Sequence, residues 1–298
     1  MDRLYFHYEV DCEPLRDKSP ACGGPSSWQI SEKVIQRFRE TFKRYDMVKG
    51  AGFYLTPEAA KAYSDLFREM KEEGFEISVQ PNVPGFRFPE YKYDLGYYDE
   101  ATQRQIIAEV LEDFGEALGF RPYTYVPCCG SKNEHTYPLL VEFGFRQAMA
   151  PVAFRYFPDR PDRCTVGSFP YPHWASPHGI LPGCLPLLVI PVTGELSLQR
   201  GGTPLDLRPE REPGYETYGS YRRIVNWNIE LMRLIRAPIK AIVAAGHNTE
   251  CVHFENVEYV MEYVFEAAEK AGMELVPAQP PDLRKVAEEL GGPEAGRG

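Results

Sequence analysis

Three carboxylic acids stand at every second position near the start of the chain: Glu9, Asp11 and Glu13. Because successive side chains of a β-strand point to opposite sides, these acids share one face of a strand predicted over residues 4–13. A divalent cation would remove the repulsion among clustered acids and supply a Lewis acid. At the C-terminal end of a barrel strand, such acids form the floor of an active site, whereas on a solvated edge strand they would be scattered surface groups. The opposite face is less polar and carries Leu4, Phe6, Tyr8, Val10 and Cys12.

Other predicted strands also end in polar side chains. A strand over residues 75–80 delivers Gln80 and, just beyond it, Asn82, and a strand over 123–127 leads to Cys128 and Cys129. A buried strand over 239–245 ends at His247. Because the C-terminal ends of parallel strands meet at one rim, we expect carboxylates, amides, thiols and an imidazole around one concave mouth.

Each of these residues also has a structural interpretation. Glu9 and Asp11 are compatible with a buried network that pairs with Arg or Lys. His247 is compatible with a hydrogen-bonded core histidine. Cys128 and Cys129 fit packed small residues better than nucleophiles, since buried thiols are usually inert.

Strands and helices alternate along almost the whole sequence, which favours parallel βα units over a sandwich. We therefore predict an α/β fold, a single parallel (β/α) barrel over residues 1–277 with seven or eight strands, distorted from ideal. A C-terminal helix and a disordered tail follow over 278–298. Helices are expected near residues 29–45, 57–74, 100–118, 133–143, 219–235 and 255–270. Further strands are expected near residues 52–55, 145–150, 186–192 and 273–276.

Two long connections, residues 83–98 and 151–185, are rich in proline and aromatic side chains. Long loops in compact domains are often functional, so we expect both to cover the rim that carries Asp11. His173 and Trp174 in the second loop, together with Cys128 and Cys129, are predicted to contact substrate, and His178 is a further histidine that could fold into the site.

Composition excludes several classes of protein. The chain has 298 residues, 43% of them hydrophobic and 26% charged, which is typical of a globular protein. A net charge of -10 argues against a general nucleic-acid binder. No apolar run has the length of a membrane span, and no export signal is visible, so we expect a cytoplasmic protein whose seven cysteines are free thiols.

The order of these motifs resembles the polysaccharide deacetylases with the NodB-homology fold, with both metal histidines of that family missing. The resemblance covers roughly residues 4 to 277. It rests on Glu9-Val10-Asp11, on residues 73–82, on Gly119-Phe120-Arg121-Pro122 with Gly130 and residues 143–146, on residues 189–193, and on Ala245-Gly246-His247.

The resemblance implies a role for each matching position. Glu9 would be the general base, Asp11 a ligand of a divalent metal ion and His247 the acid that protonates the leaving amine. The two metal histidines fall on the amides Gln80 and Asn82, which suit calcium or magnesium better than zinc. Glu13 or Cys128 could complete a different metal site.

Three hypotheses follow for the function. The first is a hydrolase of carbon–nitrogen bonds that deacylates an N-acyl amino sugar or a related carbohydrate amide or ester. The second is an inactive barrel that binds a glycan or another small molecule without hydrolysis and without a metal. The third is a cysteine-dependent hydrolase that uses Cys128 or Cys129 with His247.

Overall fold

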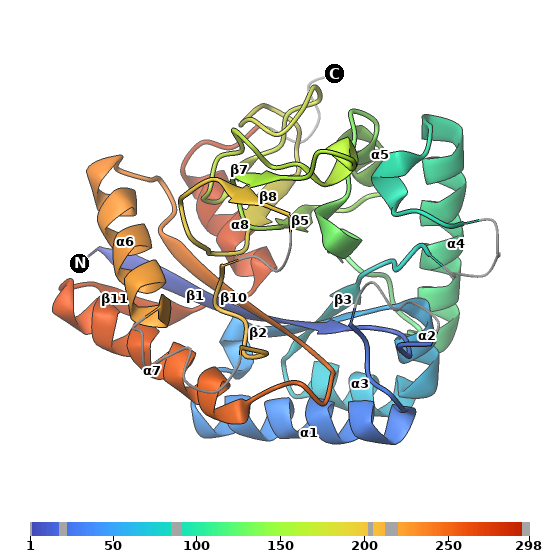
Figure 1. The fold of residues 1–298 in the computed structure, drawn as a ribbon, viewed down its shortest axis with the longest axis horizontal. Coiled ribbons are helices and arrows are strands. Elements are labelled where there is room, and N and C mark those ends of the chain that lie inside the picture. The colour runs from blue at the N-terminus through green and yellow to red at the C-terminus, as the bar shows by residue number, and fades with distance from the viewer. Residues whose placement is uncertain (1, 18–22, 85–90, 202–204, 212–219, 294–298) are drawn as a thin grey trace.

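The computed structural model describes residues 2–17, 23–84, 91–201, 205–211 and 220–293. Within these ranges one curled sheet dominates, with the strand order β10-β1-β2-β3-β4-β5-β8-β7 (Figure 1). All neighbouring pairs are parallel except the edge pair of β7 and β8. The strands on this path are β1 (Arg3–Cys12), β2 (Ala51–Leu55), β3 (Glu76–Val79), β4 (Thr124–Tyr125), β5 (Gln147–Ala150), β7 (His173–Trp174), β8 (Leu188–Pro191) and β10 (Ala241–His247).

A further strand, β11 (Glu274–Pro277), pairs with the first half of β1, and two short strands, β6 (Arg155–Tyr156) and β9 (Gln199–Arg200), form a separate ladder. Helices surround the outside of the sheet (Figure 1). They are α1 (Trp28–Arg44), α2 (Pro57–Ala62), α3 (Ser64–Glu72), α4 (Glu100–Leu118), α5 (Thr136–Glu142), α6 (Ser220–Leu234) and α7 (Phe254–Lys270), and α8 (Pro280–Glu289) lies at one end of the barrel. None of the helices in the described ranges combines the length and the apolar character that a membrane crossing requires.

Local signals in the sequence account for several helix ends. The Asp99 side chain accepts a hydrogen bond from the Thr102 N–H at the start of α4, and Gly119 ends that helix in the left-handed region. The helix expected over residues 57–74 is instead divided at Tyr63 into α2 and α3. The Tyr63 ring packs against Trp28 and its hydroxyl donates to the Trp28 carbonyl, so a tertiary contact breaks the helix there.

The two faces of β1 pack into two separate cores, as the alternation in the sequence predicts. Leu4, Phe6 and Tyr8 are fully buried in the core between the sheet and its surrounding helices. Tyr5 instead joins an inner core with residues of β8 and β10, among them Ile190 and Val243. The inward face of β1 therefore points into the barrel, and Glu9 and Asp11 continue that face.

The curled sheet closes through Thr193, which follows β8. The Thr193 N–H donates to the Val243 carbonyl on β10 over 2.9 Å, and the Val243 N–H donates to the Thr193 hydroxyl over 2.9 Å. These bonds join the two sides of the sheet and confirm the predicted distorted barrel.

Helix α8 covers the N-terminal end of the barrel. Leu283 and Ala287 are buried in the inner core, and the Arg284 guanidinium donates to the carbonyls of Arg146 and Pro186 over 2.7 and 2.9 Å. Those two carbonyls precede β5 and β8, so α8 lies under the strand starts. Of the tail predicted from about residue 291, residues 294–298 lie outside the described residues.

Candidate active site

A cavity of about 460 Å³ opens at the C-terminal end of the barrel. Its volume is in the range of small-molecule sites. The wall is built by the ends of β1, β3, β5 and β10 together with the long connections after β5 and β8. Of the residues singled out in the sequence, Glu9, Asp11, Glu13, Gln80, Cys129 and His247 line it.

The strand register places the first acid pair beside the histidine. Asp11 on β1 lies opposite His247 on β10, and Glu9 lies opposite Ala245. The Asp11 Oδ2 is 3.9 Å from the His247 Nε2. The tips of two adjacent parallel strands thus bring together carboxylates and an imidazole that are more than 200 residues apart in the sequence.

Burial dominates the electrostatics of Glu9 and Asp11. Desolvation and then the neighbouring Asp11 raise the pKa of Glu9 well above its ordinary value. Desolvation raises the pKa of Asp11 to about 6, although the charges of His247 and Arg208 oppose the shift. The two carboxyl groups interact directly, so burial and their mutual repulsion favour the protonated form of the pair.

Glu210 orients His247 from the side of the imidazole ring that faces away from Asp11. Its Oε1 accepts hydrogen bonds from the His247 backbone N–H over 2.7 Å and from Nδ1 over 3.1 Å. This leaves Nε2 facing Asp11, as in the carboxylate–histidine pairs that fix the imidazole in metal and catalytic sites. Burial opposes a charge on His247, but Glu210 and then Asp11 outweigh it and raise the pKa of the imidazole to about 9.

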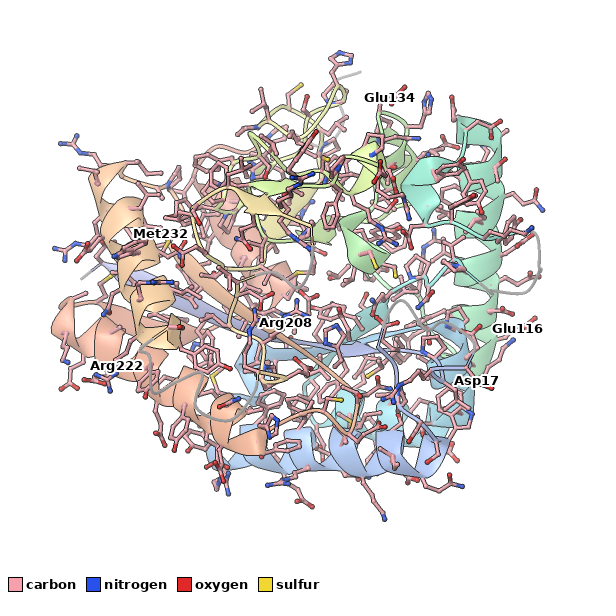
Figure 2. All side chains as sticks on the ribbon, in the orientation of Figure 1. Asp17, Glu116, Glu134, Arg208, Arg222 and Met232 are labelled. Carbon is pink, nitrogen blue, oxygen red and sulfur yellow. The ribbon has the colours of Figure 1, made fainter. Side chains whose placement is uncertain are left out.

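Sequence reasoning missed several charged residues of this site, because they come from the connection between β8 and β10. Asp206 is 1% exposed and binds the guanidinium groups of Arg208 and Arg211. Arg208 lies near the centre of the molecule in Figure 2, lines the cavity and faces the Glu9–Asp11 pair. Only the acidic and basic character of residues 206–211 could have signalled them, since this connection has no periodic pattern.

The predicted metal amides act as hydrogen-bond donors. The Gln80 Nε2 donates to Glu13 Oε1 over 3.0 Å, and the Asn82 Nδ2 donates to Glu13 Oε2 over 2.8 Å. The Asn248 side chain accepts the Glu13 N–H over 2.9 Å and donates to the Glu13 carbonyl over 3.1 Å. Gln80 Oε1 is buried with no hydrogen-bond partner, so its oxygen remains able to accept one. Glu13 is therefore held rigidly at the end of β1.

The donor set at the mouth fits a divalent cation. One ligand atom each from Asp11, Glu13 and His247 lies within 4.8 Å of the other two, and Asp11 Oδ1 is buried with no hydrogen-bond partner. Two carboxylates and one imidazole form a mixed oxygen and nitrogen set, and the raised pKa of Asp11 reflects a buried charge that a cation would stabilise.

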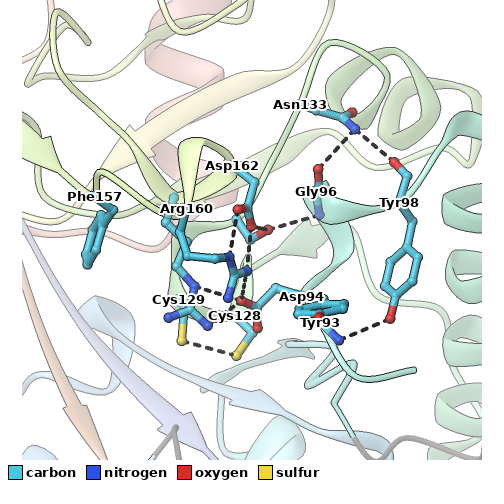
Figure 3. Close-up of polar contacts among 12 residues, drawn as sticks. Tyr93, Asp94, Gly96, Tyr98, Cys128, Cys129, Asn133, Phe157, Arg160 and Asp162 are labelled. Atoms are coloured by element: carbon cyan, nitrogen blue, oxygen red, sulfur yellow. Dashed lines mark hydrogen bonds and ion pairs between the residues drawn. The ribbon is translucent and has the colours of Figure 1, made fainter. Parts of the chain in front are cut away.

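The two adjacent cysteines, Cys128 and Cys129, follow strand β4 at the same end of the barrel. Their sulfur atoms are 3.8 Å apart, and Cys129 has a φ of +51°, which is uncommon outside glycine. Cys129 reaches the cavity, whereas Cys128 is 4% exposed, and the two cysteines form a second group of potential ligands with Asp94 (Figure 3). All six cysteines in the described ranges are free thiols, and Cys22 lies outside them.

The structure does not bring His173 and Trp174 to the main cavity. Both belong to the edge strand β7, where His173 Nδ1 bonds to the Tyr171 carbonyl over 2.7 Å and Trp174 packs against Arg284. The first part of the same loop, residues 151–163, does line the cavity. In the other loop Asp94 contacts Arg163 of this wall, and residues 85–90 lie outside the described residues.

No protein-family model and no curated sequence matches this chain. Solved structures do resemble it over nearly its whole length. A Mycobacterium smegmatis protein assigned as a polysaccharide deacetylase has a TM-score of 0.59 at 15% identity, covering 100% of this chain and 95% of the other. The allantoinase PuuE has a TM-score of 0.60 at 16% identity, covering 99% and 93%.

A more distant match links the fold to a different chemistry. A branching enzyme of glycoside hydrolase family 57 from Thermococcus kodakaraensis has a TM-score of 0.51 at 13% identity, covering 98% of this chain and 72% of the other. At these identities the comparisons establish the architecture and not the reaction. The chain therefore has the (β/α)-barrel fold of the polysaccharide deacetylases, as the order of its motifs indicated.

Proposed function

We propose that this protein is a hydrolase that removes an acyl group from an N-acyl amino sugar or from a related carbohydrate amide or ester. The observation that carries the proposal is the juxtaposition of the Glu9–Asp11 pair and the His247–Glu210 pair on one wall of the cavity. Amide hydrolysis needs one group that accepts a proton from water and one that protonates the leaving nitrogen.

The environment of each residue suits one of these roles. Glu9 interacts directly with Asp11, and the nearby charge of Arg208 favours ionisation of the pair. In the proposal, Glu9 accepts the proton of the attacking water after the Glu9–Asp11 pair has lost the proton that burial favours. His247 is kept charged by Glu210 and Asp11, so it holds a proton at Nε2 for the leaving group.

Asp11, Glu13 and His247 would hold a divalent cation. When bound, such an ion polarises a carbonyl group and lowers the pKa of water. His247 must then be neutral, because a protonated imidazole cannot bind a metal. In that state Glu9 both accepts the proton and returns it to the leaving group.

Binding of a glycan without hydrolysis is the second candidate. The surroundings of Glu13 favour this candidate. One Glu13 carboxylate oxygen accepts a hydrogen bond from Gln80, and the other accepts one from Asn82. Those bonds would compete with ion binding and could leave the site without a Lewis acid.

The test combines metal analysis with release of acetate from N-acetylglucosamine oligomers. The protein is stripped with a chelator and reloaded separately with Mg²⁺, Mn²⁺ and Zn²⁺. We expect acetate release that Asp11→Asn and His247→Gln each reduce at least 100-fold. The control is Asp65→Asn, which removes a fully exposed carboxylate. Glycan binding with no acetate release under any loading condition would favour the second candidate, and activity that survives Asp11→Asn would refute the mechanism.

A further inference from the structure

Strand β4 leads into a group of two thiols and one buried carboxylate that the proposed hydrolysis does not use. The sulfur atoms of Cys128 and Cys129 are 3.8 Å apart, and one carboxylate oxygen of Asp94 lies within 4.8 Å of both (Figure 3). Thiolates and carboxylates are ligands of zinc and of similar borderline-soft cations. In the strand order β2 and β3 separate β4 from β1, so this group is distinct from the ligand set at the end of β1.

The spacing of the two sulfur atoms matches a shared ion. Two sulfurs that are each bound about 2.3 Å from a tetrahedral zinc ion lie about 3.8 Å apart. A carboxylate oxygen about 2.0 Å from the same ion would lie about 3.5 Å from each sulfur. The distance from the Asp94 oxygen to the sulfurs therefore needs to decrease by at most about 1.3 Å for all three atoms to bind one ion.

A fixed backbone turn brings the two thiols together. Successive side chains diverge in a regular strand or helix, but the φ of +51° at Cys129 interrupts the regular backbone. The Gly130 N–H donates to the Pro127 carbonyl over 3.0 Å, and the Ser131 N–H donates to the Cys128 carbonyl over 3.1 Å. These bonds hold the turn before an ion arrives, which lowers the entropic cost of binding.

The carboxylate of Asp94 supplies independent evidence for a ligand. It is 1% exposed, and its Oδ2 accepts hydrogen bonds from Arg160 over 2.7 Å and from Arg163 over 2.8 Å. Its Oδ1 is also buried but has no hydrogen-bond partner among the described residues. A buried oxygen without a partner costs free energy, which a bound cation would offset. The two arginines orient the carboxylate, as outer hydrogen-bond partners do for metal ligands.

The charges around Cys129 bear on which ion the group would hold. Burial opposes the charge of Arg163, but Cys129 and then Asp94 outweigh it and raise the pKa of Arg163. Cys129 also interacts electrostatically with Arg155. A neighbouring guanidinium favours the thiolate, which is the form that binds metals. The same guanidinium groups repel a cation, so the group would retain ions that thiolates bind strongly, such as Zn²⁺, and not Mg²⁺ or Ca²⁺.

We propose that Cys128, Cys129 and Asp94 bind one divalent cation of the zinc class, at a site separate from the ligand set at the ends of β1 and β10. Cys129 and Gly130 line the cavity, so the ion reaches the site from there. Three protein ligands leave a fourth position for water or for a donor atom of a compound in the cavity. Binding at this site does not require that the protein is a hydrolase.

Titration with Co²⁺ tests the site, because Co²⁺ replaces zinc among thiolate ligands and gives a sulfur-to-cobalt charge-transfer band. The full chain is stripped with a chelator and kept reduced with a phosphine, and mass spectrometry confirms that Cys128 and Cys129 are not oxidised. We expect one equivalent of thiolate-bound cobalt. Zn²⁺ should displace it stoichiometrically, whereas a large excess of Mg²⁺ should not.

Variants identify the ligands. Cys128→Ser and Cys129→Ser should each weaken cobalt binding by about 100-fold or more, and Asp94→Asn by about tenfold or more. Cys251→Ser, which changes an exposed thiol, is the matched control and should keep the band. Asp11→Asn should also keep it, because Asp11 belongs to the other ligand set. Thermal melting checks that each variant is folded. If Asp94→Asn does not fold, the wild-type stoichiometry and the two cysteine variants still decide.

Two results would overturn the site. One is the absence of a sulfur-to-cobalt band in the reduced wild-type protein. The other is a band that persists in folded Cys128→Ser and Cys129→Ser, whether or not Asp11→Asn removes it. Neither result depends on acetate release, so failure of this metal site and failure of the proposed hydrolase are distinguishable.

Discussion

His7 provides a quantitative test of how the barrel interior is built. It lies on the inward face of β1, is 1% exposed, and bonds through Nδ1 to the Ala278 carbonyl over 3.1 Å. Its Nε2 lies 2.9 Å from the Tyr54 hydroxyl. Because a carbonyl only accepts hydrogen bonds, Nδ1 carries the proton and the Tyr54 hydroxyl donates to Nε2. Both contacts are thus made by a neutral ring, and burial lowers the pKa of His7 to about 4.

The consequence for stability follows from proton linkage. Above pH 6.5 neither the folded nor the unfolded state protonates His7. As the pH falls below 6.5 the unfolded state takes up a proton that the folded state does not, so the free energy of unfolding decreases. The slope is about 1.4 kcal/mol per pH unit, which gives a loss of about 2 kcal/mol at pH 5 and a limit of about 3 kcal/mol near the folded pKa.

Urea unfolding of the wild-type protein and of His7→Gln at pH 7 and pH 5 measures this term. Glutamine can form hydrogen bonds but does not titrate in this range. The wild-type protein should lose about 2 kcal/mol more than the variant between the two pH values, because the other titrating groups contribute equally to both. Equal losses in the two proteins would show that His7 is not buried as a neutral ring. The variant must first show a native circular dichroism spectrum at pH 7.

Three further predictions concern single side chains. Leu283→Ala should lower the free energy of unfolding in urea by about 2–5 kcal/mol, since it opens a cavity where α8 fills the barrel end. Thr193→Val should cost about 1–3 kcal/mol in the same assay, because the buried Val243 N–H loses its acceptor. Cys128→Ala should change acetate release less than threefold, since Cys128 is buried and does not line the cavity; a loss above 100-fold would instead support cysteine-dependent hydrolysis.

The sequence predicted the strands and their tips better than the connections. Alternation along β1 separated the helix-facing side chains from the inward ones, because successive side chains of a strand point to opposite sides and the inward face carries the polar residues. The rule that parallel strands end at one rim then brought Glu9, Asp11 and His247 together. The break at Tyr63 was not predicted, since it depends on a contact with Trp28 that no local pattern records.

The connections supplied the residues that the sequence did not identify. From the β8–β10 connection Arg208 reaches the cavity and Glu210 binds His247, and Arg155 reaches the cavity from the β5–β8 connection. Neither segment has hydrophobic periodicity, so its path is set by tertiary hydrogen bonds such as those of Thr165. His173 and Trp174 come from the same long loop, but their pairing with β8 holds them at the sheet edge.

The two amides that follow β3, Gln80 and Asn82, bear on the kind of cation that the proposed site would accept. Gln80 and Asn82 direct their N–H groups at Glu13 and so hold an additional carboxylate at the end of β1. The candidate ligand set thereby moves toward Asp11 and Glu13, with His247 as the nitrogen donor among the three. A set richer in carboxylate oxygen is harder than one with two imidazoles and favours Mg²⁺, Mn²⁺ or Ca²⁺ over Zn²⁺. If a cation binds there, the hydrogen bonds from Gln80 and Asn82 would fix the position of Glu13 but would also compete with the ion for its oxygens. The amides of β3 therefore act on the site indirectly, by orienting a carboxylate.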